Sequence, residues 1–206
     1  MSPDQLSDAG LQGVRDSEAL RLYAYPDPAS PLHKAAPGQP WGFKPAQEIL
    51  NNLPVAVQIK SGKPWTLAYG MTEHTDGRPI LSRDSCTREE AEAWLRIIVA
   101  PYERAVAESV QIPLNQPMFD ALTNMAYNIG AHAFRTSTLV RRLNAGQIIE
   151  AQAQFDEWVN AQGARNNGLV KRRNLEQAWF NEGILALPLD PATRASFEKL
   201  VREMDR

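Results

Sequence analysis

The chain has 206 residues, of which 43% are hydrophobic and 22% are charged. This composition excludes an intrinsically disordered chain, and the length is enough for one domain, or one domain with two lobes, around a substantial core. The formal net charge is −2. A single cysteine, Cys86, excludes an internal disulfide, so folding needs no oxidising compartment, and we expect a structural role for this residue.

The first predicted element is a helix that begins at residue 2 and runs to about residue 20. A serine cap, a proline at the first helical position and a glutamine three residues after the cap indicate its start. Leu11, Val14 and Glu18 are spaced by three and four residues, which places the Glu18 side chain on the stripe that faces the core. An acidic side chain on a core-facing stripe needs a structural or functional explanation.

Three short strands are predicted at residues 20–25, 65–69 and 79–81, and together they indicate a small antiparallel sheet. No strand-helix unit repeats along the chain, which argues against a doubly wound sheet. An insert at residues 28–65 separates the first two strands, and positions 26–64 hold eight of the fifteen prolines. We expect an ordered excursion with one short helix near residues 45–53.

The second half of the chain has a helical pattern. A capping box at Thr87 and Glu90 predicts one helix, and the apolar spacing of residues 116–129, followed by Gly130, predicts another. Shorter helices are expected at residues 137–144, 148–161 and 170–180, and a last helix from Asp190. The predicted fold class is α+β, in one domain with a cleft between two lobes. Residues 1–86 form the small mixed lobe, including the insert, and residues 87–206 form the larger helical lobe.

Two carboxylates in the small lobe have different predicted surroundings. Glu18 on an apolar helix stripe is desolvated, which favours its neutral acid form. Asp27 lies between Pro26 and Pro28, which exclude helical geometry and place its ionised carboxylate in a turn facing solvent. A proton donor and an ionised base are the pair that cleavage of a glycosidic bond requires. Taken singly, a solvent-facing helix glutamate and a turn-forming aspartate are simpler interpretations.

The joint spacing of the two carboxylates carries a family resemblance. Residues 17–27 read Ser-Glu-Ala-Leu-Arg-Leu-Tyr-Ala-Tyr-Pro-Asp. They resemble the Glu-Gly-x-x-x-x-x-Tyr-x-Asp signature of the phage-type lysozymes, the endolysin muramidases of glycoside hydrolase family 24. Residues 119–130, 134–139 and 168–176 resemble the central helix of that family, its Phe-x-x-Ser-Thr-Leu turn and its Gly-Leu-x-x-Arg-Arg-x-x-Glu run. Alanine and methionine at positions 19 and 71 depart from the family's usual glycine and histidine.

The resemblance implies a lysozyme-like fold and an endolysin that hydrolyses the β-1,4 bond between N-acetylmuramic acid and N-acetylglucosamine in bacterial peptidoglycan. It makes Glu18 the acid and Asp27 the base, with Thr66 placing the attacking water. Such a reaction inverts the anomeric carbon and needs carboxyl groups roughly 6.5–9.5 Å apart. The first thirty residues contain no sustained apolar run, so we expect no secretory signal or membrane anchor. The resemblance then implies a holin that releases the enzyme from the host cytoplasm to the cell wall.

Substrate contacts are also implied in the helical lobe. By the resemblance, Tyr127 and Asn128 contact sugar, and Arg172 or Arg173 lies near a peptide or lactyl carboxylate of the glycan. The alternative for Tyr127 is a core aromatic residue. For the arginines it is ion pairs, for example with Glu176, that pin neighbouring helices.

The insert is the largest departure from the family pattern, because 38 residues separate Asp27 from Thr66 where the family has a handful. We hypothesise that Trp41, or Phe43 or Trp65, lines the cleft and stacks on sugar rings. The alternative is a small hydrophobic cluster that holds the insert down.

Other functions compete with that of a muramidase. A lytic transglycosylase would use Glu18 on the same bond without Asp27, and a non-catalytic wall-binding or virion protein of the same fold would tolerate the loss of Glu18. Residues 135–173 carry seven arginines and lysines against three acidic residues. This local positive charge could attract a phosphate backbone. A solvated helix face is the preferred explanation of the charge, so we expect no nucleic-acid partner. The three histidines and the cysteine lack the paired spacing of a zinc site. We expect no metal, no cofactor and a monomer.

Overall fold

The computed structural model describes residues 2–161 and 163–204, with side chains described to residue 202. The chain divides into two compact units. One, the helical unit, comprises the residues up to Val14 together with those from Val99 onward, and the other, the strand-containing unit, comprises Arg15–Ile98. The boundaries fall inside α1 (Asp8–Ser17) and α5 (Arg88–Ser109) rather than at residue 86. Two continuous helices therefore each contribute residues to both units.

The strand-containing unit is built on a two-stranded antiparallel sheet of β1 (Arg21–Pro26) and β2 (Trp65–Ala68). Its register pairs Arg21 with Ala68, Tyr25 with Thr66, and Pro26 with Trp65. Both strands were predicted. The third predicted strand, residues 79–81, is wrong as a strand, because Pro79 makes only an isolated bridge. A proline nitrogen has no hydrogen to donate to a strand ladder.

The insert between these strands is ordered, as predicted, but it holds three short helices instead of one. They are α2 (Pro31–Ala35), α3 (Ala46–Leu50) and α4 (Val55–Gln58). The start of α2 follows a serine cap and a first-turn proline, since Ser30 Oγ accepts a hydrogen bond from the backbone N–H of His33 at 3.2 Å. Leu32, Trp41 and Ile49 are buried and give the insert an apolar interior.

α1 begins later than the sequence predicted. Ser7, not Ser2, caps it, because Ser7 Oγ accepts from the Gly10 N–H at 3.1 Å. The preceding residues form no helix and are bonded elsewhere, with the Leu6 N–H donating to Glu103 Oε1 at 2.8 Å. The helix also ends at Ser17 rather than near residue 20. In contrast, the capping box at the start of α5 is confirmed by reciprocal hydrogen bonds between Thr87 and Glu90.

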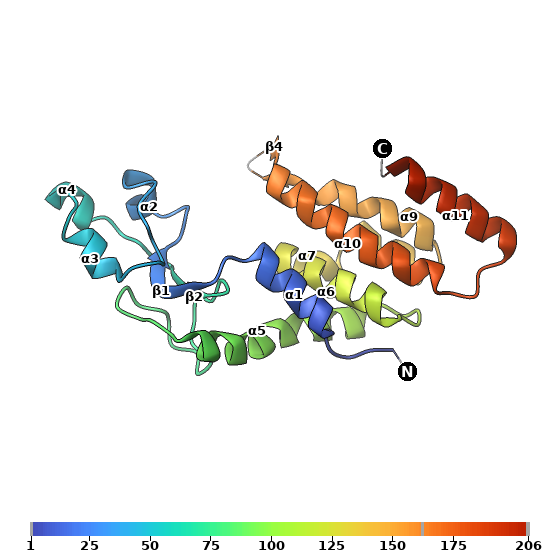
Figure 1. Ribbon diagram of the computed structural model, residues 1–206, viewed down its shortest axis with the longest axis horizontal. Helices are drawn as coiled ribbons and strands as arrows, with labels where there is room; N and C mark the ends of the chain where they lie inside the picture. The colour runs from blue at the N-terminus through green and yellow to red at the C-terminus, as the bar shows by residue number, and fades with distance from the viewer. Residues whose placement is uncertain (1, 162, 205–206) are drawn as a thin grey trace. The chain divides into compact units, whose positions relative to one another are not determined.

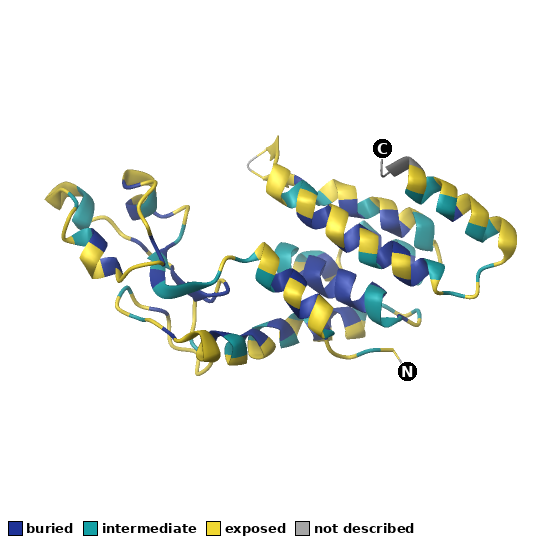
Figure 2. Cartoon of the chain, viewed as in Figure 1, coloured by how far each residue is buried: buried dark blue, intermediate teal, exposed yellow. Residues whose placement is uncertain are grey.

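The helical unit is organised around α6 (Gln116–Ile129), whose limits and Gly130 cap match the prediction. Nine consecutive residues, Met118–Ala126, are buried, and Figure 2 shows α6 as the most buried helix of the unit. α10 (Asn167–Leu185) packs along it, as Figure 1 shows. Gly183 permits this contact, because a Cβ there would lie 2.3 Å from Met118 Cγ. Such extensive apolar burial is the main source of stability for the unit.

Further elements complete the helical unit. They are α7 (Ala131–Arg135), α8 (Thr138–Asn144), α9 (Ile148–Gln152), the 3₁₀ helix η1 (Ala153–Trp158), strands β3 (Asn160–Ala161) and β4 (Ala164–Arg165), and α11 (Pro191–Met204). The predicted helix at residues 148–161 is thus a short α-helix, a 3₁₀ turn and a strand, whereas α10 extends beyond the predicted 170–180. No helix within residues 2–161 and 163–204 combines the length and apolarity needed to span a bilayer.

Candidate active site

Glu18 lies in the short connection between α1 and β1. The prediction that it occupies the apolar stripe of a helix is therefore wrong, because the helix ends one residue earlier. Leu11 and Val14 on that stripe are buried, whereas Glu18 is half-buried. A carboxyl group in this position retains access to solvent, which a proton donor to a bound substrate also needs.

The chain just before Glu18 is fixed by three side chains of the strand-containing unit. Arg15 Nη2 lies 2.8 Å from Glu92 Oε2, and Tyr69 donates its hydroxyl to Glu92 Oε1 at 2.5 Å. The hydrogen bonds from Arg15 and Tyr69 lower the pKa of the Glu92 carboxyl, while burial and this carboxylate raise the pKa of Tyr69 to about 12. The cluster joins the end of α1 to α5 and to the residue after β2, and so constrains where Glu18 can lie.

Asp27 occupies a tight turn after β1, as its flanking prolines predicted. Its N–H donates to Pro64 O at 3.0 Å, and its carbonyl oxygen accepts from Ser30 N at 2.8 Å. Its carboxylate Oδ1 accepts from the Ala29 N–H at 2.7 Å, which is the hydrogen bond of an Asx turn. The turn fixes the direction of a half-buried carboxylate at the end of the sheet.

Thr66 lies on β2 directly opposite Tyr25 and is only 6% exposed. Burial raises the pKa of Tyr25, and the carboxylates of Glu18 and Asp27 raise it further, while Arg21 and a side-chain hydrogen bond with Thr66 oppose the shift. The pKa of the Tyr25 phenol is therefore raised by both predicted carboxylates, and the phenol is hydrogen-bonded to the predicted threonine. The structure brings the three residues together around Tyr25, which the sequence reasoning did not single out, although the tyrosine is part of the signature motif.

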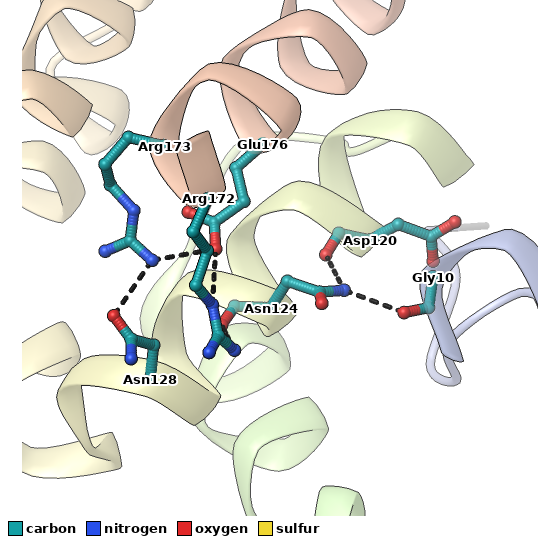
Figure 3. Close-up of polar contacts among 7 residues, drawn as sticks. All are labelled: Gly10, Asp120, Asn124, Asn128, Arg172, Arg173 and Glu176. Carbon is teal, nitrogen blue, oxygen red and sulfur yellow. Dashed lines mark hydrogen bonds and ion pairs between the residues drawn. The ribbon is translucent and has the colours of Figure 1, made fainter. Parts of the chain in front are cut away.

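The two arginines predicted to lie near a glycan carboxylate, Arg172 and Arg173, make structural contacts. Arg173 is fully buried and donates through Nη2 to Glu176 Oε1 at 2.8 Å and to Asn128 Oδ1 at 3.0 Å. Arg172 is 8% exposed and donates through Nε to the same Glu176 oxygen at 3.3 Å and through Nη2 to Asn124 O at 3.3 Å. Figure 3 shows this network joining α10 to α6. These contacts favour the helix-pinning alternative over direct recognition of a substrate carboxylate.

The network is costly to ionise because it is enclosed. Burial raises the pKa of Glu176 to about 7 against the pull of both arginines, and burial also lowers the pKa of Arg173. Both shifts have the same physical cause, the loss of hydration around charges in the interior. On the far side of α6, Asn124 donates to Gly10 O at 2.9 Å and Asp120 O at 3.0 Å, which ties the first turns of α1 to this helix (Figure 3).

Tyr127 and Asn128 lie at the end of α6 and are both half-buried. Tyr127 packs edge-on against Tyr102, with ring centroids 5.0 Å apart. Asn128 lines a pocket of about 290 Å³ together with Trp158, Glu157 and neighbouring residues of η1, β3 and α10. Arg173 holds its amide oxygen, so Asn128 is the better positioned of the two to present a fixed polar group to a ligand.

Trp41 is 4% exposed and donates its indole N–H to Ala36 O at 3.2 Å. Its burial favours the alternative that it anchors the insert, because a buried ring has no free face for a sugar. Trp65 is likewise buried, at 8%. Phe43 differs, since it is 64% exposed and the Arg21 guanidinium lies 4.1 Å from its ring centroid.

Comparison with known proteins shows the family and the fold. The family model described as phage lysozyme matches residues 53–176. The endolysin of Acyrthosiphon pisum secondary endosymbiont phage 1 is 38% identical over 129 residues, covering 61% of this chain and 84% of the relative. The chain belongs to the phage lysozyme family. The family match begins after Asp27 and therefore does not include Glu18 or Asp27.

Two further similar proteins cover more of the chain. The endolysin of Bacillus phage PZA is 32% identical over 179 residues, which are 87% of this chain but 56% of that relative. The chain thus spans little more than half of the length of that protein. The solved endolysin of Escherichia coli O157:H7 phage FAHEc1 has a TM-score of 0.62 at 28% identity, covering 85% of this chain and 92% of its own. The predicted lysozyme-like α+β fold is confirmed.

Proposed function

We propose that this protein is an endolysin that hydrolyses the β-1,4 bond between N-acetylmuramic acid and N-acetylglucosamine in bacterial peptidoglycan. The observation that carries the proposal is the gathering of Glu18, Asp27 and Thr66 around the Tyr25 phenol. Membership of the phage lysozyme family and the identity with named endolysins support it.

The chemistry assigns one role to each of the three groups. Glu18 donates its proton to the glycosidic oxygen as the bond breaks, so the leaving sugar departs as a neutral alcohol. Asp27, held in its turn, accepts a proton from the attacking water. Thr66 orients that water with its hydroxyl. Attack from the face opposite the leaving group inverts the anomeric carbon, and we expect the carboxyl groups roughly 6.5–9.5 Å apart.

The proposed substrate contacts are chosen by the exposure of their side chains. We propose Asn128 as a polar contact to the glycan, because it lines a pocket and its amide is held by Arg173. Tyr127 is proposed as its neighbour in that contact. In the insert, Phe43 replaces Trp41 as the proposed stacking residue, because it is the exposed aromatic side chain of the three considered.

The decisive experiment compares wild type with Glu18→Gln and Asp27→Asn on purified Gram-negative sacculi, with release of reducing ends as the readout. Loss of a general acid or base lowers such rates by roughly 10²–10⁴-fold. The matched control is Glu48→Gln, which neutralises an exposed carboxylate of the same unit and is expected to keep full activity. Full activity of Glu18→Gln would contradict the proposal, and a wild type that binds sacculi but releases no reducing ends would fit a non-catalytic wall-binding or virion role.

The products separate hydrolysis from transglycosylation. Proton NMR of fresh digests is expected to show the inverted anomer first, and mass spectrometry is expected to show reducing muramyl ends. Anhydro-muramyl ends, together with an active Asp27→Asn variant, would instead assign the lytic transglycosylase reaction.

Delivery and assembly follow from the resemblance to phage-type lysozymes. We propose that the enzyme remains in the host cytoplasm until a holin opens the membrane, and that it acts as a monomer. Expression without a holin is expected to leave cells intact until chloroform is added, and size-exclusion chromatography with light scattering is expected to give one 23.0 kDa chain. Lysis without permeabilisation would refute holin dependence.

A further inference from the structure

We propose that Tyr25 is a positioning residue of this site, whose hydroxyl holds the Thr66 hydroxyl in the orientation that directs the attacking water. The inference rests on the proposed function. It adds to the acid, the base and the threonine a fourth side chain that acts through Thr66 rather than on the sugar.

The geometry comes from the strand register. Tyr25 and Thr66 are paired residues of the antiparallel sheet, so their side chains lie on the same face with Cβ atoms about 4.5–5.5 Å apart. Asp27 follows Tyr25 by two residues, and its N–H continues the pairing by donating to Pro64 O at 3.0 Å. The register thus places the phenol, the threonine and the aspartate turn at one end of the sheet.

The hydrogen bond between the two hydroxyls restricts Thr66. A threonine side chain is stiff about χ1, and its hydroxyl has one donor and two acceptor positions. When Tyr25 occupies one of these positions, the directions left for a water are defined. Thr66 is only 6% exposed, so few waters compete for it, and one held in that direction stays close to the sheet end.

The surroundings of the phenol keep it protonated. Burial first, and then the negative charges of Glu18 and Asp27, raise its pKa, with Arg21 and the Thr66 hydrogen bond acting in the opposite direction. A neutral phenol keeps both a donor and an acceptor at neutral pH. It can therefore bond Thr66 and still interact with a neighbouring carboxylate or water.

The test is Tyr25→Phe, which removes the hydroxyl and keeps the ring. We expect kcat on purified peptidoglycan to fall roughly tenfold, since one hydrogen bond that orients the nucleophile is lost. KM is expected to stay within about twofold and the melting temperature within about 2 °C, because the packing of the ring is unchanged. The matched control is Tyr23→Phe on the same strand, which is expected to leave kcat unchanged.

A double-mutant cycle with Thr66→Ala tests whether Tyr25 acts through the threonine. Tyr25→Phe is expected to cost no further activity once the Thr66 hydroxyl is gone. Additive losses in kcat would overturn the inference, and so would a Tyr25→Phe variant with wild-type kcat or with a lowered melting temperature as its main defect. Inactive wild-type enzyme would refute the proposed function and this inference together. If wild type is active and Glu18→Gln is inactive, unaltered kcat in Tyr25→Phe refutes the inference alone.

Discussion

The contact between α6 and α10 provides a quantitative test of the packing. Alanine at position 183 would place its Cβ 2.3 Å from Met118 Cγ, 2.6 Å from Asn115 Oδ1 and 3.1 Å from the Met118 backbone nitrogen. Met118 is fully buried, and Asn115 caps α6 while donating to Gly183 O at 2.7 Å. Two side chains would have to move, and a backbone atom on the partner helix limits how far the methyl group can be accommodated.

Helix propensity acts in the opposite direction, because alanine is favoured over glycine in a helix by about 1 kcal/mol. Overpacking a filled interior costs about 1–3 kcal/mol, and disturbing an asparagine cap costs about 1 kcal/mol more. We therefore expect Gly183→Ala to destabilise the protein by about 2 kcal/mol. At roughly 2–4 °C per kcal/mol for a chain of this size, the melting temperature falls by roughly 4–8 °C.

Calorimetry of wild type, Gly183→Ala and Gly168→Ala measures this difference. Gly168 is the matched control in α10, because its added Cβ would meet only the exposed Asn166 side chain, at 3.0 Å. The helix propensity of alanine favours this variant by up to about 1 kcal/mol, and the contact with the Asn166 cap opposes it, so we expect stability to change by less than about 1 kcal/mol. The penalty at position 183 is also expected to shrink in a Met118→Ala background. A Gly183→Ala variant at least as stable as wild type would refute the packing argument.

Three further outcomes follow from the strand-containing unit. Phe43→Ala is expected to raise KM severalfold with an unchanged melting temperature, whereas Trp41→Ala is expected to lower the melting temperature; the reverse pattern would return the stacking role to Trp41. Because the hydrogen bond from Arg15 lowers the folded-state pKa of Glu92, its stabilisation is present above the usual glutamate pKa and is lost as pH falls through the folded value. Urea midpoints of Glu92→Gln and wild type are thus expected to differ at pH 7 and to converge near pH 3, and a constant difference would contradict this. Burial raises the pKa of Cys86 to about 11, so iodoacetamide at pH 7.5 is expected to label it far more slowly in the native protein than in urea, and equal rates would show that the thiol is exposed.

Local signals in the sequence were reliable where the physical cause is also local. The limits of α6, the capping box at Thr87 and Glu90, and the turn at Asp27 were all predicted, because each depends on residues within a few positions. The start of α1 was mispredicted for the opposite reason. Two serines could cap it, and the choice was made by partners about a hundred residues away, Glu103 for Leu6 and Asp120 for Ser7.

The candidate site divides in the same way. The sequence and its family resemblance predicted Glu18, Asp27 and Thr66 as site residues, but Glu18 was placed inside a helix and Tyr25 was given no role. The strand register that pairs Tyr25 with Thr66 crosses an insert of 38 residues, and no local rule fixes such a pairing. The sequence also could not determine which aromatic side chain of the insert is exposed. Trp41 and Phe43 belong to the same residue class and differ only in their burial in the folded structure.

The sequence by itself determined the family, the limits of α6 and the capping box at the start of α5, since caps, turns and hydrophobic spacing act through neighbours along the chain. Only the tertiary structure decided that Arg172 and Arg173 belong to a buried network with Glu176, and that Tyr25 joins the predicted carboxylates and threonine. A charged or aromatic side chain suits both a ligand site and an interior contact. Its surroundings, set by residues distant in the chain, decide which of the two it serves.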